Sequence, residues 1–121
     1  MEKDTVYLIS DAHFGIDLQG CEALEPAFFK WLQEISPEMS QLIIVGDLFD
    51  FWIEYKSSIR ADYFQVLHAL KKVSEQGTEI HYLAGNHDFA LGSFLEEKIG
   101  IVIHHGDYNT EIQGKKVHIY H

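Results

Sequence analysis

The sequence predicts an α/β protein with a largely parallel sheet, because apolar strand-like segments alternate with segments of helical spacing. Residues 5–10, 41–45 and 78–83 have strand character, and residues 23–35 and 61–76 between them have helix character. This order is typical of right-handed βαβ units, whose successive strands run parallel. The chain has 121 residues, enough for one domain with its own core.

Both helices are predicted from one stripe of apolar residues. The first stripe contains Leu24, Phe28, Leu32 and Ile35, and Pro26 falls in the first turns, where proline is tolerated. The second stripe consists of Tyr63, Val66, Leu67, Leu70 and Val73.

The last third of the chain is predicted to add three smaller elements. A short helix covers about residues 93–98 and ends at Gly100, and the strand IVIH follows at 101–104. Residues 110–120, TEIQGKKVHIY, are expected to form two strands that turn near Gly114.

Composition limits the classes of partner. Nine basic and nineteen acidic residues give a formal net charge of −10, which disfavours binding to nucleic acid. Cys21 is the single cysteine, so an intramolecular disulfide is excluded. The start, MEKDTVYLIS, lacks a signal-peptide pattern, and no apolar run reaches the length of a membrane span. We therefore expect a cytoplasmic protein, with peripheral contact to the inner face of the membrane still compatible.

Polar residues follow three predicted strands at their carboxyl ends. SDAHFG follows the first strand, GDLFD the second and GNHD the third. Because parallel strands end at one edge of a sheet, we expect these side chains to converge there. They belong to Asp11, His13, Asp47, Asn86, His87 and Asp88.

This mixture of side chains suits a pair of divalent metal ions. Carboxylate and amide oxygens together with imidazole nitrogen match manganese, iron, cobalt or zinc better than a thiolate-type zinc site. Asp47, on a middle strand, can bridge two ions, and two ions can activate water and clamp a phosphoryl group. A single aspartate after a strand is often only a turn former, so the prediction depends on all three motifs together.

In this order, D-x-H, GD and GNHD resemble the calcineurin-like metallophosphoesterases, and the resemblance covers the whole chain. Within that family, SDAHFG and GDLFDFW look most like the UDP-2,3-diacylglucosamine pyrophosphatases of lipid A biosynthesis, many of which have arginine in place of His87. The resemblance implies a β-sandwich flanked by helices (αββα). Residues 1–121 would be the amino-terminal part of that domain, because the later G-H-x-H motif is absent from them.

The resemblance also implies roles for individual residues. Asp11 and His13 would hold one ion, Asp47 would bridge, and Asn86 with His121 would hold the other, with manganese the expected metal. Asn86 and His87 would contact the substrate, and His87 would protonate the leaving oxygen, a role that suits an imidazole near neutral pH. The implied reaction is hydrolysis of UDP-2,3-diacylglucosamine to UMP and 2,3-diacylglucosamine 1-phosphate, with little or no activity in the 121-residue chain alone.

Two histidine positions compete for the last ligand. His121 ends a predicted strand in which Val117, Ile119 and His121 alternate onto one face, so that the apolar pair would direct the imidazole inward. HHGD at 104–107 spells the family's His-Gly-Asp motif outright, with His105 as the ligand. We favour His121.

Residues 49–59, FDFWIEYKSSI, are unusually apolar for a loop beside a metal site. They either pack under a further part of the protein or form an apolar wall for the acyl chains of a lipid substrate. The expected partner is a phosphate-containing small molecule or lipid, and exposed sheet edges favour self-association. The rival functions are a nucleotide phosphodiesterase of the same fold and a non-catalytic scaffold.

Overall fold

The computed structural model describes residues 3–15, 23–54, 58–86, 88 and 93–121. Four parallel strands form one sheet in the order β1-β2-β3-β4, and β5 and β6 form an antiparallel hairpin. The strands are β1 (Thr5–Ile9), β2 (Met39–Val45), β3 (Glu79–Leu83), β4 (Ile101–His104), β5 (Tyr108–Ile112) and β6 (Lys115–Ile119). The helices are α1 (Leu24–Ile35), the 3-10 turn η1 (Ala61–Tyr63), α2 (Phe64–Glu75) and the short π-type turn η2 (Leu95–Ile99).

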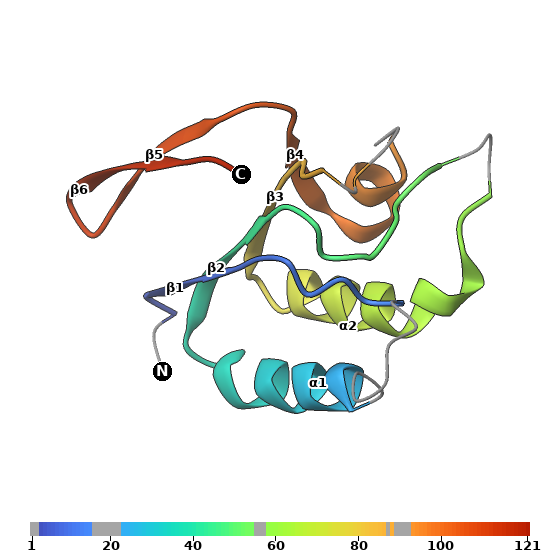
Figure 1. Ribbon diagram of the computed structural model, residues 1–121. Coiled ribbons are helices and arrows are strands. Elements are labelled where there is room, and N and C mark those ends of the chain that lie inside the picture. Colours follow the sequence, from blue (N-terminus) through green and yellow to red (C-terminus); the bar gives the residue numbers. More distant parts are fainter. Residues whose placement is uncertain (1–2, 16–22, 55–57, 87, 89–92) are drawn as a thin grey trace.

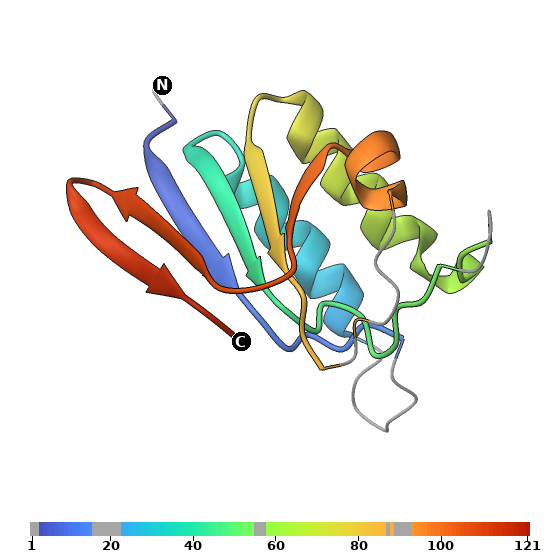
Figure 2. The ribbon, with the colours of Figure 1, turned by 90° about the horizontal axis from the view of Figure 1, so that it is seen from above.

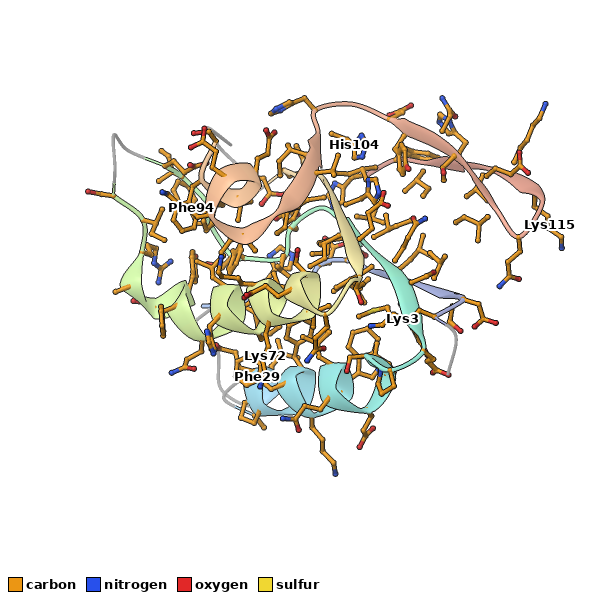
Figure 3. All side chains as sticks on the ribbon, turned by 180° about the vertical axis from the view of Figure 1, so that it is seen from behind. Lys3, Phe29, Lys72, Phe94, His104 and Lys115 are labelled. Atoms are coloured by element: carbon orange, nitrogen blue, oxygen red, sulfur yellow. The ribbon has the colours of Figure 1, made fainter. Side chains whose placement is uncertain are left out.

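The layers follow from which faces of the elements are apolar. The helices α1 and α2 lie on one face of the sheet and the hairpin on the other (Figure 1). The main core is formed between helices and sheet, where side chains fill the intervening space (Figure 3). Its fully buried members include Met39, Leu42, Ile44, Val66, Leu70 and Ile80.

The hairpin packs on the second face of the sheet through a smaller apolar cluster. Ile119 of β6 contacts Ile43 of β2 and Leu83 of β3, and all three are buried. Leu8 of β1 and Val102 of β4 remain 49% and 45% exposed. The hairpin therefore covers only part of this face.

The turn of the hairpin explains how its two strands are aligned. Gln113 and Gly114 both have positive φ, 52° and 80°. Two consecutive residues in this region form the type of two-residue turn whose twist matches antiparallel strands. Such a turn fixes the register in which Asn109 lies opposite His118.

The predicted α/β fold with parallel strands and a terminal hairpin is confirmed, with small shifts at the ends of elements. The first strand ends at Ile9, the second begins at Met39, and η2 begins two residues later than predicted. Within the apolar loop, Phe49 and Trp52 are 0% and 1% exposed and pack with Tyr63 in the main core. These two rings support the fold of this chain itself, which neither interpretation of the loop had foreseen.

Candidate metal centre

The carboxyl ends of β1 and β2 lead into two loops that stay hydrogen-bonded to each other. The backbone N–H of Asp11 donates to the carbonyl of Gly46 at 3.2 Å, and that of His13 donates to the carbonyl of Asp47 at 3.1 Å. The parallel pairing of the strands thus continues beyond their ends. It holds the residues of SDAHFG beside those of GDLFD.

Three residues of these loops have left-handed backbone conformations. Asp11, His13 and Asp47 have φ values of 55°, 50° and 51°. A non-glycine residue in this region costs on the order of 1–3 kcal/mol and needs support from its surroundings. The left-handed conformation at these positions turns the three side chains away from the directions they would have in a continuing strand.

The side chains that result form a compact group of metal-binding type. Among the residues that the structure describes, Asp11, Asp47 and His121 offer ligand atoms that all lie within 4.8 Å of one another. Nε2 of His121 is 3.4 Å from Oδ1 of Asp11 and 3.6 Å from Oδ2 of Asp47. The carboxyl end of the chain therefore reaches the ends of the first strands, as Figure 2 shows.

His13 faces the same two carboxylates. Its Nε2 is 3.5 Å from Oδ1 of Asp11 and 3.9 Å from Oδ2 of Asp47. Its other ring nitrogen, Nδ1, is 3.8 Å from Oδ1 of Asp50. A carboxylate near Nδ1 favours a proton there and leaves the lone pair of Nε2 directed at the cluster.

The hairpin explains why His121, and not His118 of β6, is in this group. Val117 and Ile119 face the sheet, so the alternation of the strand carries His121 to the same side. His118 faces the other way, and its Nδ1 is 2.5 Å from Oδ1 of Asn109. This geometry favours His121 over the HHGD alternative.

The histidines of the HHGD segment have other surroundings. His105 is exposed. His104 places its Nε2 2.8 Å from Nδ1 of His81, and the ring of Tyr108 stacks on both imidazoles. His81 is a buried strand residue that also contacts Glu79. Neither histidine of the motif belongs to the group formed with Asp11 and Asp47.

Two described residues of the GNHD segment, Gly85 and Asp88, lie against Asp47. Asn86 is exposed in the turn that follows β3. Its neighbour Gly85 lies against Asp47, because a Cβ on Gly85 would come within 2.7 Å of the Asp47 backbone nitrogen. His87 lies outside the described residues, so its predicted contact with substrate stays a prediction.

Burial and charge decide what the cluster can hold. Asp47 is 2% exposed, and a buried carboxylate is costly unless cations or hydrogen-bond donors accompany it. Burial raises the pKa of Asp11, but hydrogen bonds from Ser10, His121 and His13 outweigh burial and leave this pKa below its ordinary value. Two carboxylates and two imidazoles are a donor set suited to manganese, iron, cobalt or zinc.

Two supporting residues were not given roles on sequence grounds. Asp50 had no predicted role, although its carboxylate lies near the imidazole of His13. Tyr82 donates a hydrogen bond to Asp88, but in the sequence it cannot be distinguished from an ordinary aromatic strand residue. Asp88 was grouped with GNHD, but its partners depend on how the loops fold. The available sequence signal for these supporting carboxylates was that an aspartate recurs after each of the first three strands.

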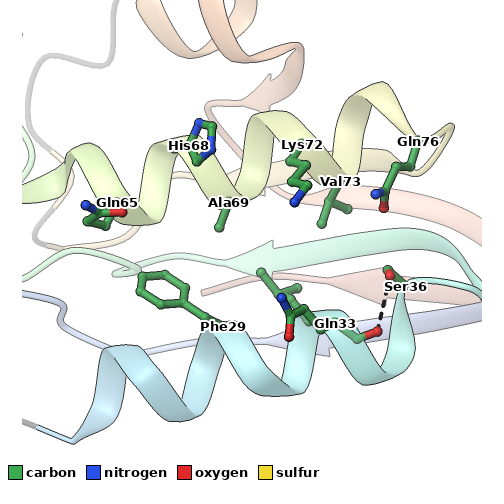
Figure 4. A pocket seen from close by; sticks show the side chains of 10 residues that line it. Phe29, Gln33, Ser36, Gln65, His68, Ala69, Lys72, Val73 and Gln76 are labelled. Carbon is green, nitrogen blue, oxygen red and sulfur yellow. Dashed lines mark hydrogen bonds between the residues drawn. The ribbon is translucent and has the colours of Figure 1, made fainter.

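The structure also contains a groove in its helical layer. It has a volume of about 250 Å³ and lies between α1 and α2, where Phe29 and Gln33 face Ala69 and Val73 (Figure 4). The residues that line it belong to the helical layer and include none of the predicted site residues. Among the described residues, no helix combines the length and apolar character needed to cross a membrane.

Comparison with known proteins gives an independent result. The family model for calcineurin-like phosphoesterases matches residues 5–118. A solved structure of a protein of unknown function from Aquifex aeolicus aligns with a TM-score of 0.63 at 22% identity, covering 96% of this chain and 59% of that one. At this identity the likeness supports the fold alone.

Curated relatives give a finer comparison. A UDP-2,3-diacylglucosamine hydrolase from Porphyromonas gingivalis is 31% identical over 120 residues, covering 98% of this chain and 46% of the relative. Proteins of the same name from Photorhabdus laumondii and Haemophilus influenzae are 34% and 36% identical, covering 82% and 78% of this chain and 41% and 38% of the relatives. The chain thus spans less than half the length of these relatives.

Proposed function

Because this chain belongs to the calcineurin-like phosphoesterase family, we propose that the protein is a metal-dependent phosphohydrolase acting on the pyrophosphate bond of UDP-2,3-diacylglucosamine. Water would add to one phosphorus while the bond to the bridging oxygen breaks, giving UMP and 2,3-diacylglucosamine 1-phosphate. The observation that carries the proposal is the convergence of Asp11, Asp47 and His121. The choice of substrate is supported by the names of the relatives.

Four of the residues that would hold the metal ions, Asp11, His13, Asp47 and His121, already face one another. Asp11 and His13 would bind one ion, Asp47 would bridge, and His121 with Asn86 would bind the second. Manganese is the expected metal. Such ions supply an activated water and neutralise charge on the phosphoryl group.

The chain's own side chains have further tasks in this proposal. The carboxylate of Asp50, 3.8 Å from Nδ1 of His13, would keep the proton on that atom and Nε2 available as a ligand. His87 would hold a proton for the oxygen of the leaving group, since imidazole titrates near neutral pH. The segment after β2 also carries Phe51 and Ile53, 41% and 43% exposed, which would offer apolar surface to the acyl chains.

The test compares substitutions at two aspartates, made in the natural protein that contains these 121 residues. Asp47→Asn keeps a residue type that tolerates positive φ but replaces the carboxylate by an amide. Asp107→Asn makes the same change at an exposed carboxylate that pairs with His118. We expect Asp47→Asn to abolish manganese binding in calorimetry and UMP release from UDP-2,3-diacylglucosamine, while Asp107→Asn behaves like the parent protein.

Other outcomes of the same experiment favour the rival functions. Manganese binding with hydrolysis of a nucleotide diester, but not of UDP-2,3-diacylglucosamine, would indicate a phosphodiesterase. A folded protein without manganese binding would indicate a scaffold. Equal activity of Asp47→Asn and the parent protein would refute the role of Asp47.

A further inference from the structure

We propose that Asp88 is a positioning residue whose carboxylate ties the loop after β2 to the loop after β3 and thereby sets the direction of the Asp47 side chain. The inference rests on the proposed function in one respect, namely that Asp47 is a metal ligand. Asp88 itself would act on the backbone and not on the metal or the substrate.

The two oxygens of Asp88 accept three hydrogen bonds from different parts of the fold. Oδ2 accepts from the backbone N–H of Asp47 at 2.9 Å and from that of Gly85 at 2.8 Å. Oδ1 accepts from the hydroxyl of Tyr82 at 2.6 Å. One side chain therefore joins the loop after β2, the loop after β3 and the body of β3.

Asp47 needs such a tie because its conformation is unfavourable by itself. Its φ is 51°, and its side chain is packed against Gly85 so closely that a Cβ there would lie 2.9 Å from the Asp47 carboxyl carbon. Left-handed conformations of non-glycine residues persist when neighbouring groups hold them in place. The bond from the Asp47 N–H to Asp88 is such a constraint at the strained residue itself.

Tyr82 gives the tie a rigid base. Its side chain is 1% exposed within the main core, and its oxygen also accepts a hydrogen bond from the backbone N–H of Leu48 at 3.3 Å. Burial, followed by the negative charge of Asp88, raises the pKa of Tyr82 far above its ordinary value, so the hydroxyl keeps its proton and remains a donor. Asp88 is thus held from the core side while it holds the two loops.

Substitution of Asp88 separates positioning from metal ligation. In Asp88→Asn, the amide oxygen can occupy the place of Oδ2 and still accept from both backbone N–H groups, whereas Asp88→Ala removes every acceptor. We expect the manganese dissociation constant to rise about 10–100-fold in Asp88→Ala and less than about tenfold in Asp88→Asn. If metal binding required the charge of Asp88, Asp88→Asn would lose as much affinity as Asp88→Ala, and the proposal would be wrong.

A second measurement needs no metal. Amide hydrogen exchange of Asp47 and Gly85 in metal-free protein should be slow in the parent and in Asp88→Asn, and faster in Asp88→Ala. Protection unchanged in Asp88→Ala overturns the proposal. Because exchange is read without manganese, this arm remains decisive even where the parent protein binds no metal and the proposed function fails.

A pair of tyrosine variants covers the case in which Asp88→Ala does not fold. Tyr82→Phe removes the donor to Asp88, and Tyr63→Phe removes a hydroxyl from an equally buried ring that bonds instead to Phe51. Exchange at Asp47 and Gly85 should quicken in Tyr82→Phe and stay unchanged in Tyr63→Phe. Equal exchange in the two variants contradicts the inference.

Discussion

Nε2 of His121 lies 3.4 Å from Oδ1 of Asp11, a residue 110 positions earlier in the chain. The contact exists because the hairpin folds over the face of the sheet opposite the helices and ends above the strand ends (Figures 1 and 2). Ile119 fixes the hairpin on Ile43 and Leu83, two residues before the imidazole. The place of the His121 imidazole in the cluster thus depends on apolar packing.

The first prediction compares two histidines. His121→Ala removes an imidazole from the cluster. Loss of a residue that only supports a metal ligand already costs about tenfold or more in affinity, so we expect the manganese dissociation constant to rise at least about tenfold. His105→Ala changes an exposed histidine and should leave affinity near that of the parent. Calorimetric titration with manganese measures both. A larger loss in His105→Ala would show that the HHGD segment supplies the ligand.

The second prediction concerns the contact between Gly85 and Asp47. In Gly85→Ala, the new methyl group would overlap the Asp47 backbone, so we expect a loss of about 1–3 kcal/mol in the free energy of unfolding and weaker manganese binding. Gly106→Ala is the matched control, because a Cβ at Gly106 meets no atom within 4 Å. Urea titrations give the free energies. Similar values for the two variants would mean that the loops can separate at little cost.

The third prediction concerns pH and His104. Burial, and then the charge of His81, lower the pKa of His104 in the folded protein. Below the unfolded pKa of about 6.5, the unfolded chain therefore binds this proton more readily than the folded chain does. The contribution of His104 to stability is complete above about pH 6.5 and declines as the pH falls toward the folded pKa.

His104→Gln should remove that contribution to the pH dependence while an amide can still bond to His81. We expect the urea midpoint of the parent to fall more than that of His104→Gln between about pH 7.5 and about pH 5.5. His105→Gln, at an exposed histidine, should follow the parent. Parallel pH profiles for the parent and His104→Gln would contradict the prediction.

The fourth prediction links the hairpin to the cluster. Ile119 is 6% exposed, so Ile119→Ala should lower the free energy of unfolding by about 2–5 kcal/mol and weaken manganese binding by loosening the strand that carries His121. Ile53→Ala removes the same atoms from a side chain that is 43% exposed, and its cost should be about 0.5 kcal/mol. Denaturant unfolding and manganese titration test both effects. Manganese affinity unchanged in Ile119→Ala would show that the hairpin does not position His121.

The local sequence pattern was sufficient to predict the helices and the hairpin turn, but not the tertiary contacts that individual residues make. The stripe of Leu70 and Val73 predicted α2, and Gly114 predicted the hairpin turn, because periodicity and turn chemistry act over a few residues. The apolar loop was ambiguous, since the burial of Phe49 and Trp52 depends on Tyr63, which follows in a different element.

The sequence by itself determined the α/β fold and the family, and it predicted Asp11, His13 and Asp47 at one sheet edge, because parallel strands necessarily end together. Only the tertiary structure decided how the loops beyond the strands are held. The left-handed turn at Asp47 and its bond to Asp88 join residues 41 positions apart. Such contacts arise when strained loops and buried side chains find a common packing, which no local pattern encodes.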